Sequence, residues 1–471
     1  MALSPTDASY TCCFRGLGDL YTYHSESNLA CFCSGQLDLR RSKCLVVFVG
    51  GLTDRLHSKR YLVPLSQRLE SRGGTLVQPI LSSAGLGYGT SSLLQDAIEI
   101  GWLLRFLHNE SCANGPACLL TAGGHQEAAE ATGCTMPPVC FIGHSTGCQD
   151  ALFLADYLHS CEKQSLEHFI GVHKLKGLVL QGPVSDRELA EKCYDPTEGA
   201  MLEALSILSN VVPDDDGRKV GCEFVLSTNS LEAIFRFRQS ATEKRELVKE
   251  ICTWLSSHEK LELFRALAKW LICSSPHTLD KQVDVRGFVG LYPIADKSSE
   301  SLIAPQLQRV AMPAGSDMGY VTAARFLGLN EPRESDDYFS SDLFFDETRS
   351  EVNAKYIAGR YAAVRQGLIN VLVVASLADE FAKPLYKTYM DTAAAITRAC
   401  VCQEDEEKTL SSQALNIEVT NVIKLYEHIS DRQVVLGYGI EHADHALSNQ
   451  SWQDQFIHLC WCFFKQIHLF E

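Results

Sequence analysis

The chain has 471 residues, of which 46% are hydrophobic and 21% are charged, an ordinary composition for a globular protein. It carries 42 basic and 58 acidic side chains, so its formal net charge is −16. This acidity argues against a nucleic-acid-binding protein, which would present a basic face, and against docking on anionic membranes. The N-terminal stretch lacks the basic and apolar regions of a signal peptide, and no window approaches the ~20 apolar residues of a membrane span.

The sequence contains 19 cysteines, an odd number without regular spacing. In the absence of a signal peptide, this usage indicates reduced thiols and a cytoplasmic protein. Three C-x-C pairs lack the C-x₂–₄-C spacing of a zinc knuckle: Cys31–Cys33, Cys400–Cys402 and Cys460–Cys462. On a strand, C-x-C spacing places two small apolar side chains on one face, so we expect no metal site.

The first half of the chain alternates between apolar runs and amphipathic segments. Residues 43–52 form a continuous apolar run that ends in two glycines, which is typical of a strand buried on both faces. Similar signals predict strands at 75–81, 138–142 and 175–184, with helices at 61–74, 93–109 and 147–161. This alternation predicts βαβ units and a mostly parallel sheet flanked by helices, an α/β fold.

The pattern lapses from about 187 to 345, where the chain is mostly helical in character, as in 243–272. Strand signals return at 369–380 and 432–447, and a last amphipathic helix is predicted at 452–470. We expect one domain with core halves at about 40–190 and 360–471, a helical cap insertion at 190–345 and a surface-loop insertion at 110–137. The alternative is a separate helical domain at 190–345. A cap is favoured because strands on both sides of the insertion must share one sheet.

Residues 143–147, GHSTG, match the G-x-S-x-G pattern of a nucleophile elbow. The pentapeptide lies between the strand predicted at 138–142 and the helix predicted at 147–161, which is the context that an elbow requires. Such a turn exposes the serine hydroxyl above the sheet and brings the backbone close to the neighbouring strand and helix. Gly143 and Gly147 therefore fit where side chains would clash. We predict that Ser145 is a nucleophile.

A serine hydroxyl needs a base, and the base needs a carboxylate that orients it. In this architecture the chain order is Ser, then Asp or Glu, then His. Asp379 follows a predicted strand and is favoured over its neighbour Glu380, while His445 leads into the last helix and is favoured over His442. Because the carboxyl ends of parallel strands meet at one edge, these loops can converge on Ser145.

Acyl transfer also needs hydrogen-bond donors for the developing oxyanion. The backbone N–H of Thr146, directly after the nucleophile, is one expected donor. The second is assigned to Leu52 in the loop after the first strong strand, with Gly51 as the fallback.

Several other polar features are interpreted as structural. The remaining histidines, such as His57, His144 and His173, are expected at the surface or in packing, and Asp150 is expected as a structural hydrogen-bonder. The glycines of 85–93, GLGYGTSSL, lack the lysine of a Walker loop and do not fit G-x-G-x-x-G. We expect no nucleotide and no other cofactor.

Five ordered motifs carry a family resemblance: VFVGGLTD, LSSAGLGYGTSSLLQDA, FIGHSTGCQDAL, LQGPVSDRE and SDDYFSSDL, the last at 335–343. Together they resemble DUF1749, a UPF0613-like eukaryotic family of the α/β-hydrolase superfamily. The resemblance implies an α/β-hydrolase fold with Ser145 as nucleophile, Asp379 as acid and His445 as base. Fungal members are associated with ester hydrolysis of siderophore-type peptides, which suggests a substrate class by analogy. Long insertions, including 399–413, depart from the family pattern.

The leading hypothesis is a cofactor-free serine hydrolase that acts on a small-molecule carboxylic ester or related acyl compound. A different class of function is a retired hydrolase scaffold that serves as a binding protein. A thioesterase or peptidase would use the same triad. The sequence gives no oligomeric state.

Overall fold

The computed structural model describes most of the predicted core and part of the insertion. The described residues are 18–35, 39–51, 54–85, 91–112, 136–163, 174–185, 187–188, 196, 198–212, 226–240, 244–274, 309–311, 320–322, 327, 337–367, 369–379, 389–401 and 420–471. The surface-loop insertion expected at 110–137 and the insertion at 399–413 fall mostly outside these residues.

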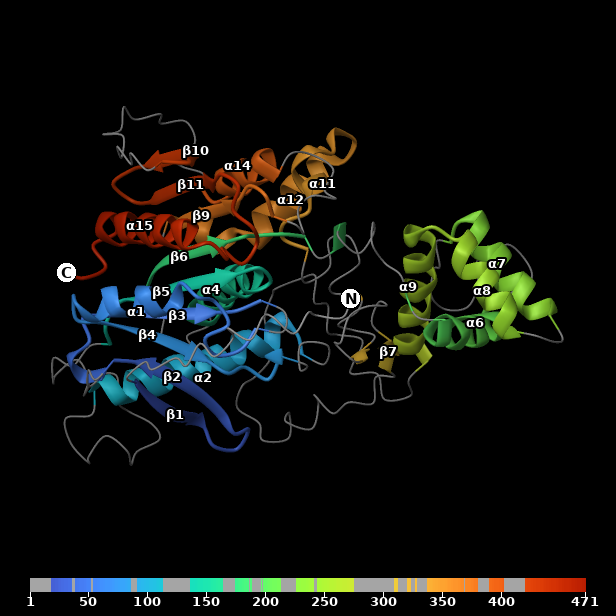
Figure 1. The fold of residues 1–471 in the computed structure, drawn as a ribbon, viewed down its shortest axis with the longest axis horizontal. Coiled ribbons are helices and arrows are strands. Elements are labelled where there is room, and N and C mark those ends of the chain that lie inside the picture. The colour runs from blue at the N-terminus through green and yellow to red at the C-terminus, as the bar shows by residue number, and fades with distance from the viewer. Residues whose placement is uncertain are drawn as a thin grey trace, which may run out of the picture.

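A nine-stranded sheet forms the centre of the described structure, in the order β1-β2-β4-β3-β5-β6-β9-β11-β10 (Figure 1). Its strands are β1 (Gly18–His24), β2 (Leu29–Ser34), β3 (Cys44–Val49), β4 (Gly74–Pro79), β5 (Val139–His144), β6 (Leu175–Gln181), β9 (Asn370–Ser376), β10 (Val422–Ile429) and β11 (Val434–Ile440). The six strands from β4 to β11 run parallel, while β1, β2 and β10 are antiparallel to their neighbours at the two edges. The predicted parallel core is confirmed.

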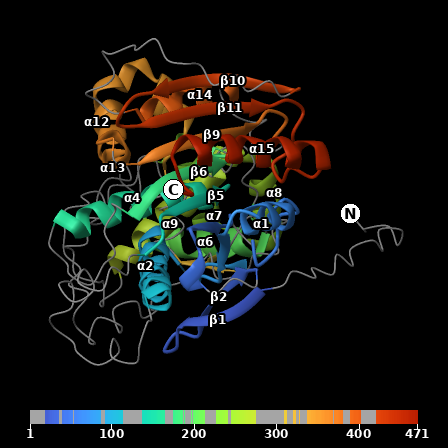
Figure 2. The same ribbon diagram turned by 90° about the vertical axis from the view of Figure 1, so that its left-hand side faces the viewer.

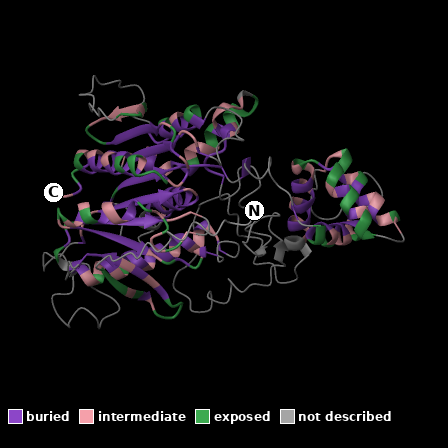
Figure 3. Cartoon of the chain, in the orientation of Figure 1, coloured by how far each residue is buried: buried purple, intermediate pink, exposed green. Residues whose placement is uncertain are grey.

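Helices cover both faces of this sheet (Figure 2). One face packs against α1 (Leu62–Glu70) and α15 (Gln450–Gln466). The other packs against α2 (Leu93–Cys112), α4 (Gly147–Lys163), α13 (Ala362–Arg365) and α14 (Tyr389–Ala399). Neighbouring side chains of one strand therefore enter different cores: Val46 of β3 lies on the α15 side and Val47 on the α4 side. This explains why β3, β5 and β11 are buried along their whole length and consist mostly of apolar residues (Figure 3).

The edge strands and one helix boundary were missed. The edge strands β1 and β10 and the strand next to β1, β2, have no counterpart among the predicted strands. β1 and β10 keep many partly or fully exposed residues and lack a continuous apolar run, whereas β2 is mostly buried. The helical stretch at 243–272 is two helices, α8 (Lys244–Trp254) and α9 (Ser257–Ser274). Ser256 and Glu259 divide them: the Ser256 N–H donates to the Glu259 carboxylate at 2.7 Å, and the Glu259 N–H donates to the Ser256 hydroxyl at 3.3 Å. This is a capping box, which begins a new helix.

Part of the insertion forms a small helical cluster with its own apolar core. Helices α8 and α9 pack with α6 (Glu198–Val211) and α7 (Thr228–Gln239) around buried side chains such as Leu205, Phe237 and Phe264. Figure 1 shows this cluster to the right of the sheet. The remaining described elements of the insertion include a two-stranded sheet of β7 (Arg309–Ala311) and β8 (Tyr320–Thr322), followed by α11 (Ser341–Phe345). Helix α12 (Ser350–Arg360) follows the insertion.

A buried polar cluster joins the two ends of the insertion. Arg187, shortly after β6, pairs with Asp337 at 3.4 Å and also with Asp342. The neighbouring Glu188 carboxylate accepts the backbone N–H of Ser341 at 2.8 Å. Ser185 and Ser340 share a further hydrogen bond of 2.7 Å. The described part of the 335–343 motif, for which the sequence predicted no role, therefore anchors the returning chain to the loop that leaves β6.

Asp156 on α4 is a buried carboxyl with a structural role. One of its oxygens accepts the N–H of Ala363 at 2.7 Å and so holds the start of α13. Burial raises the pKa of Asp156 to about 8, although the Ala363 N–H and the nearby Arg360 charge oppose the shift.

Because the folded pKa lies above the unfolded value, the Asp156 contribution to stability is complete below about pH 4 and is lost as pH rises towards 8. Asp156→Asn keeps an acceptor for Ala363 and removes the titration. We expect the variant to gain stability relative to wild type between pH 5 and pH 8, by at least about 1.4 kcal/mol, the value of one pKa unit. Denaturant unfolding across this range measures the gain, and a pH-independent difference would contradict the assignment.

Candidate active site

Ser145 lies on a tight turn between β5 and α4. Its φ angle is +56°, in the left-handed region that non-glycine residues rarely adopt. Its backbone N–H donates to the Gln181 carbonyl of β6 at 3.0 Å, and its carbonyl accepts the N–H of Cys148 at 2.9 Å. Bonds on both sides hold the residue in this sparsely populated conformation, which is the geometry predicted for the elbow.

The two glycines of the pentapeptide occupy positions without room for a side chain. A Cβ atom at Gly143 would lie within 3.0 Å of the backbone of Gly147 and Cys148. One at Gly147 would lie equally close to the carbonyl oxygens of Val49 and Gly50 at the end of β3. These contacts are with backbone atoms, which cannot rotate away as a flexible side chain can. The predicted reason for both glycines is confirmed.

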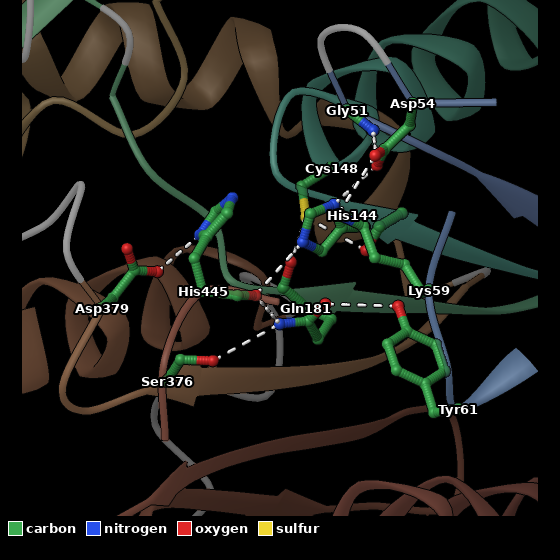
Figure 4. A network of polar contacts seen from close by, with 11 residues as sticks. Gly51, Asp54, Lys59, Tyr61, His144, Cys148, Gln181, Ser376, Asp379 and His445 are labelled. Carbon is green, nitrogen blue, oxygen red and sulfur yellow. Dashed lines mark hydrogen bonds and ion pairs between the residues drawn. The ribbon is translucent and has the colours of Figure 1, made fainter. Parts of the chain in front are cut away.

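Asp379 and His445 meet at the same edge of the sheet. Asp379 follows β9, His445 follows β11, and the Asp379 carboxylate lies 2.7 Å from Nδ1 of His445 (Figure 4). Both side chains are buried. Gly182, directly after β6, lies against the pair: a Cβ there would sit 3.3 Å from His445 Nδ1 and 3.7 Å from the Asp379 carboxylate. Since Ser145 is hydrogen-bonded to Gln181, three loops converge at this point.

The described alternatives fit this arrangement less well. His442 is exposed and takes a positive φ of 59° in the same loop. Glu380, the other candidate acid, lies outside the described residues. The geometry therefore supports the choice of Asp379 and His445, whose catalytic roles stay predictions.

The structure describes two of the three candidate oxyanion donors, Thr146 and Gly51. Thr146 lies between Ser145 and the first residue of α4, Gly147, and is buried. Leu52 lies outside the described residues. The N–H of Gly51, the fallback donor, points at the Asp54 carboxylate and donates to it at 2.9 Å (Figure 4). A donor already engaged by a carboxylate is poorly placed for an oxyanion, so the geometry disfavours Gly51, and the assignment of Leu52 stays a prediction.

His144 has a larger role than the packing residue expected from the sequence. Its ring is fully buried between Asp54 and the loop that carries His445. Nδ1 lies 3.0 Å from the Asp54 carboxylate, and Nε2 lies 3.2 Å from the backbone oxygen of His445. Burial lowers the pKa of His144 to about 4, although its bond to Asp54 opposes the shift. The one sequence signal for this role is its position beside the predicted nucleophile.

The described part of the chain contains no cluster of three or more His, Cys, Asp or Glu side chains that could hold a metal ion. Cys31 and Cys33 lie buried on β2, as expected for C-x-C spacing on a strand. His57 is half-buried and contacts Phe32, and Asp150 is buried on α4. His173 lies outside the described residues. No helix that the structure describes is both long and apolar enough to span a membrane.

The parallel sheet, the elbow and the buried Asp–His pair define an α/β-hydrolase fold. A solved structure titled siderophore hydrolase from Aspergillus fumigatus is similar to the chain with a TM-score of 0.50 and 18% identity, covering 96% of this chain and 98% of that one. At this identity the likeness concerns the fold. The family model for proteins of unknown function DUF1749 matches residues 8–248, about half of the sequence. The chain belongs to this family.

Named relatives match a shorter region. An esterase of Emericella nidulans is 26% identical over 180 residues, which cover 36% of this chain and 43% of the relative. A fusarinine C esterase of Aspergillus fumigatus is 26% identical over 175 residues, covering 35% of this chain and 45% of the relative. The chain thus spans less than half the length of each of these relatives.

Gly147→Ala tests the close approach at the elbow. The added methyl group meets backbone oxygens of β3, so we expect a loss of about 1–3 kcal/mol in the free energy of unfolding. Gly359→Ala on α12 is the matched control, because a Cβ there meets nothing within 4 Å. In this exposed helix position the same change should stabilise by roughly 0.5–1 kcal/mol. Equal effects of the two variants in denaturant unfolding would contradict the packing argument.

Proposed function

We propose that this protein is a serine hydrolase that cleaves carboxylic esters through an acyl-enzyme intermediate. The observation that carries the proposal is the buried 2.7 Å contact between Asp379 and Nδ1 of His445, at the edge where the strained Ser145 turn lies. The names of the esterase relatives support the same reaction class. Because these relatives match only in part, the activity of the whole chain is inferred from the site.

In the proposed mechanism, the Ser145 hydroxyl attacks the ester carbonyl while His445 takes its proton. Asp379 holds the proton on Nδ1 of His445, so that Nε2 is the basic nitrogen, and it stabilises the imidazolium that forms. The N–H groups of Thr146 and Leu52 hold the oxyanion. His445 then returns its proton to the alcohol that leaves, and water activated by the same ring releases the acid and regenerates Ser145.

Esters are preferred over thioesters and peptides because the relatives' names point to esters, one of them an ester of fusarinine C. A siderophore-type ester therefore belongs in the first substrate panel, beside short p-nitrophenyl esters, acyl-thioesters and peptides. Hydrolysis of thioesters or peptides alone would support the alternative use of the same triad. A wild-type protein that binds an ester without turning it over would support the retired-scaffold alternative.

We further propose that the chain is one α/β-hydrolase domain in which helices α6–α9 form a cap insertion. The polar cluster of Arg187 and Glu188 with residues 337–342 supports this organisation, because it ties both ends of the insertion to the core. The separate apolar core of α6–α9 instead fits the alternative of a second domain. Limited proteolysis distinguishes them: release of a stable α6–α9 fragment from a still-folded core would contradict the cap.

Ser145→Ala tests the nucleophile. We expect a fluorophosphonate probe to label the wild-type protein and not the variant, with ester hydrolysis reduced by about 10⁴-fold or more, since the residues of a triad act as a unit. Ser451→Ala, which changes an exposed serine at the start of α15, is the matched control and should keep full labelling.

His445→Gln and Asp379→Asn complete the series. The glutamine removes the base and should abolish labelling, whereas the asparagine disturbs the ring tautomer and should lower the rate by up to about 10⁴-fold. A folded wild-type protein that resists the probe, or a Ser145→Ala variant that is still labelled, would refute the proposed nucleophile.

A further inference from the structure

We propose that His144 is a positioning residue, which fixes the backbone of the base His445 relative to Ser145 and to the loop after β3. This inference rests on the proposed serine hydrolase function and adds a second histidine to it. The geometry behind it is a chain of contacts that runs from the partly buried Lys59 and Asp54 through the buried His144 to the carbonyl oxygen of His445 (Figure 4).

Asp54 forms the anchor of this chain. Its carboxylate accepts the Gly51 N–H at 2.9 Å, lies 3.0 Å from Nδ1 of His144 and pairs with the Lys59 ammonium at 3.1 Å. Burial alone would raise the pKa of Asp54, but the His144 bond, the Lys59 charge and the Gly51 N–H outweigh it and lower the pKa to about 2. Asp54 is therefore ionised at neutral pH, so it holds the loop after β3 and the His144 ring together.

His144 lies between Asp54 and the base His445 and contacts both. Its ring sits 4.7 Å from the His445 ring, measured between centroids, and its Nε2 faces the His445 carbonyl oxygen. These contacts connect His144 to Asp54, which lies 90 positions away in the sequence, and to His445, which lies 301 positions away. Thus one side chain, on the residue before the nucleophile, contacts both the loop after β3 and the base loop.

Gln181 supports the same carbonyl from the other side. Its Nε2 donates to the His445 oxygen at 3.1 Å, and its Oε1 accepts the Tyr61 hydroxyl at 3.3 Å (Figure 4). Two neighbouring side chains therefore converge on one backbone atom of the base. Side chains that are themselves fixed by burial and hydrogen bonds give a catalytic group a defined place.

The contacts of His144 exclude it as the base. The neutral ring has one N–H, which it can donate from Nδ1 to the Asp54 carboxylate or from Nε2 to the His445 carbonyl oxygen, so each ring nitrogen lies beside an acceptor other than the Ser145 hydroxyl. His144 therefore acts through His445, and displacement of a base by about 1 Å can cost on the order of 10²-fold in rate.

Three substitutions separate the two contacts. His144→Phe removes both polar contacts and keeps the ring volume. His144→Asn keeps a donor near the Nδ1 position, towards Asp54, and loses the reach to His445. His144→Gln can place its amide near the Nε2 position, towards His445, and loses the Asp54 contact. His458→Asn, at a partly exposed histidine on α15, controls for loss of a histidine elsewhere.

We expect kcat for an ester to fall by about 10- to 100-fold in His144→Phe, with KM changed by less than about twofold, because the substrate does not touch His144. His144→Gln should recover part of this loss and have a higher kcat than His144→Asn, since the glutamine restores the contact with the loop that carries His445. His458→Asn should match wild type. Thermal unfolding of each variant shows that the compared proteins are folded.

Histidine NMR gives a readout that does not depend on turnover. With ¹⁵N-labelled histidine, the Nδ1 proton that His445 shares with Asp379 should give a downfield signal that shifts or is lost in His144→Phe and is unchanged in His458→Asn. A kcat within about twofold of wild type in a folded His144→Phe variant would overturn the proposal. An unchanged downfield signal would also overturn it. If wild type fails to react with the fluorophosphonate while this signal responds to His144, the proposed function fails and the positioning role stands.

Discussion

The close approach of α4 to the end of β3 is the constraint on which the site depends. Gly147 begins α4 with its Cα against the carbonyl oxygens of Val49 and Gly50, so the helix can start only a short distance above the sheet. The chain must therefore reverse from β5 into α4 within two residues, which forces Ser145 to a φ of +56°. The strain at Ser145 is thus a consequence of packing, and the backbone bonds to Gln181 and Cys148 hold it.

The topology of the parallel sheet brings the loops that carry Asp379 and His445 to the same place as Ser145. β3, β5, β6, β9 and β11 all end at one edge, so the loops that follow them meet there although they come from distant parts of the sequence. The insertion leaves the core at this same edge, after β6. The polar cluster around Arg187 holds its two ends next to the loop that passes Gly182 and the Asp379–His445 pair.

The sequence predicted the parts that depend on local patterns. Central strands such as β3 are continuous apolar runs because both of their faces are buried, and GHSTG is recognisable because its glycines occupy positions without room for a side chain. The edge strands β1 and β10 escaped prediction because many of their residues are partly or fully exposed. The Ser256–Glu259 capping box was visible in the sequence and was overlooked within a long helical pattern. The contacts of His144 could not be predicted, since its partners Asp54 and His445 lie 90 and 301 positions away and are joined only by the folded sheet.

The central claim is that Ser145 is the nucleophile and that His445, oriented by Asp379, is its base. A crystal structure of the protein after reaction with a fluorophosphonate tests this most directly. We expect phosphorus bonded to Ser145 Oγ, a phosphoryl oxygen within hydrogen-bond distance of the Thr146 N–H, and Nε2 of His445 facing the adduct while Nδ1 keeps its contact with Asp379. An adduct on another residue, or a Ser145 adduct with His445 turned away from it, would refute these roles.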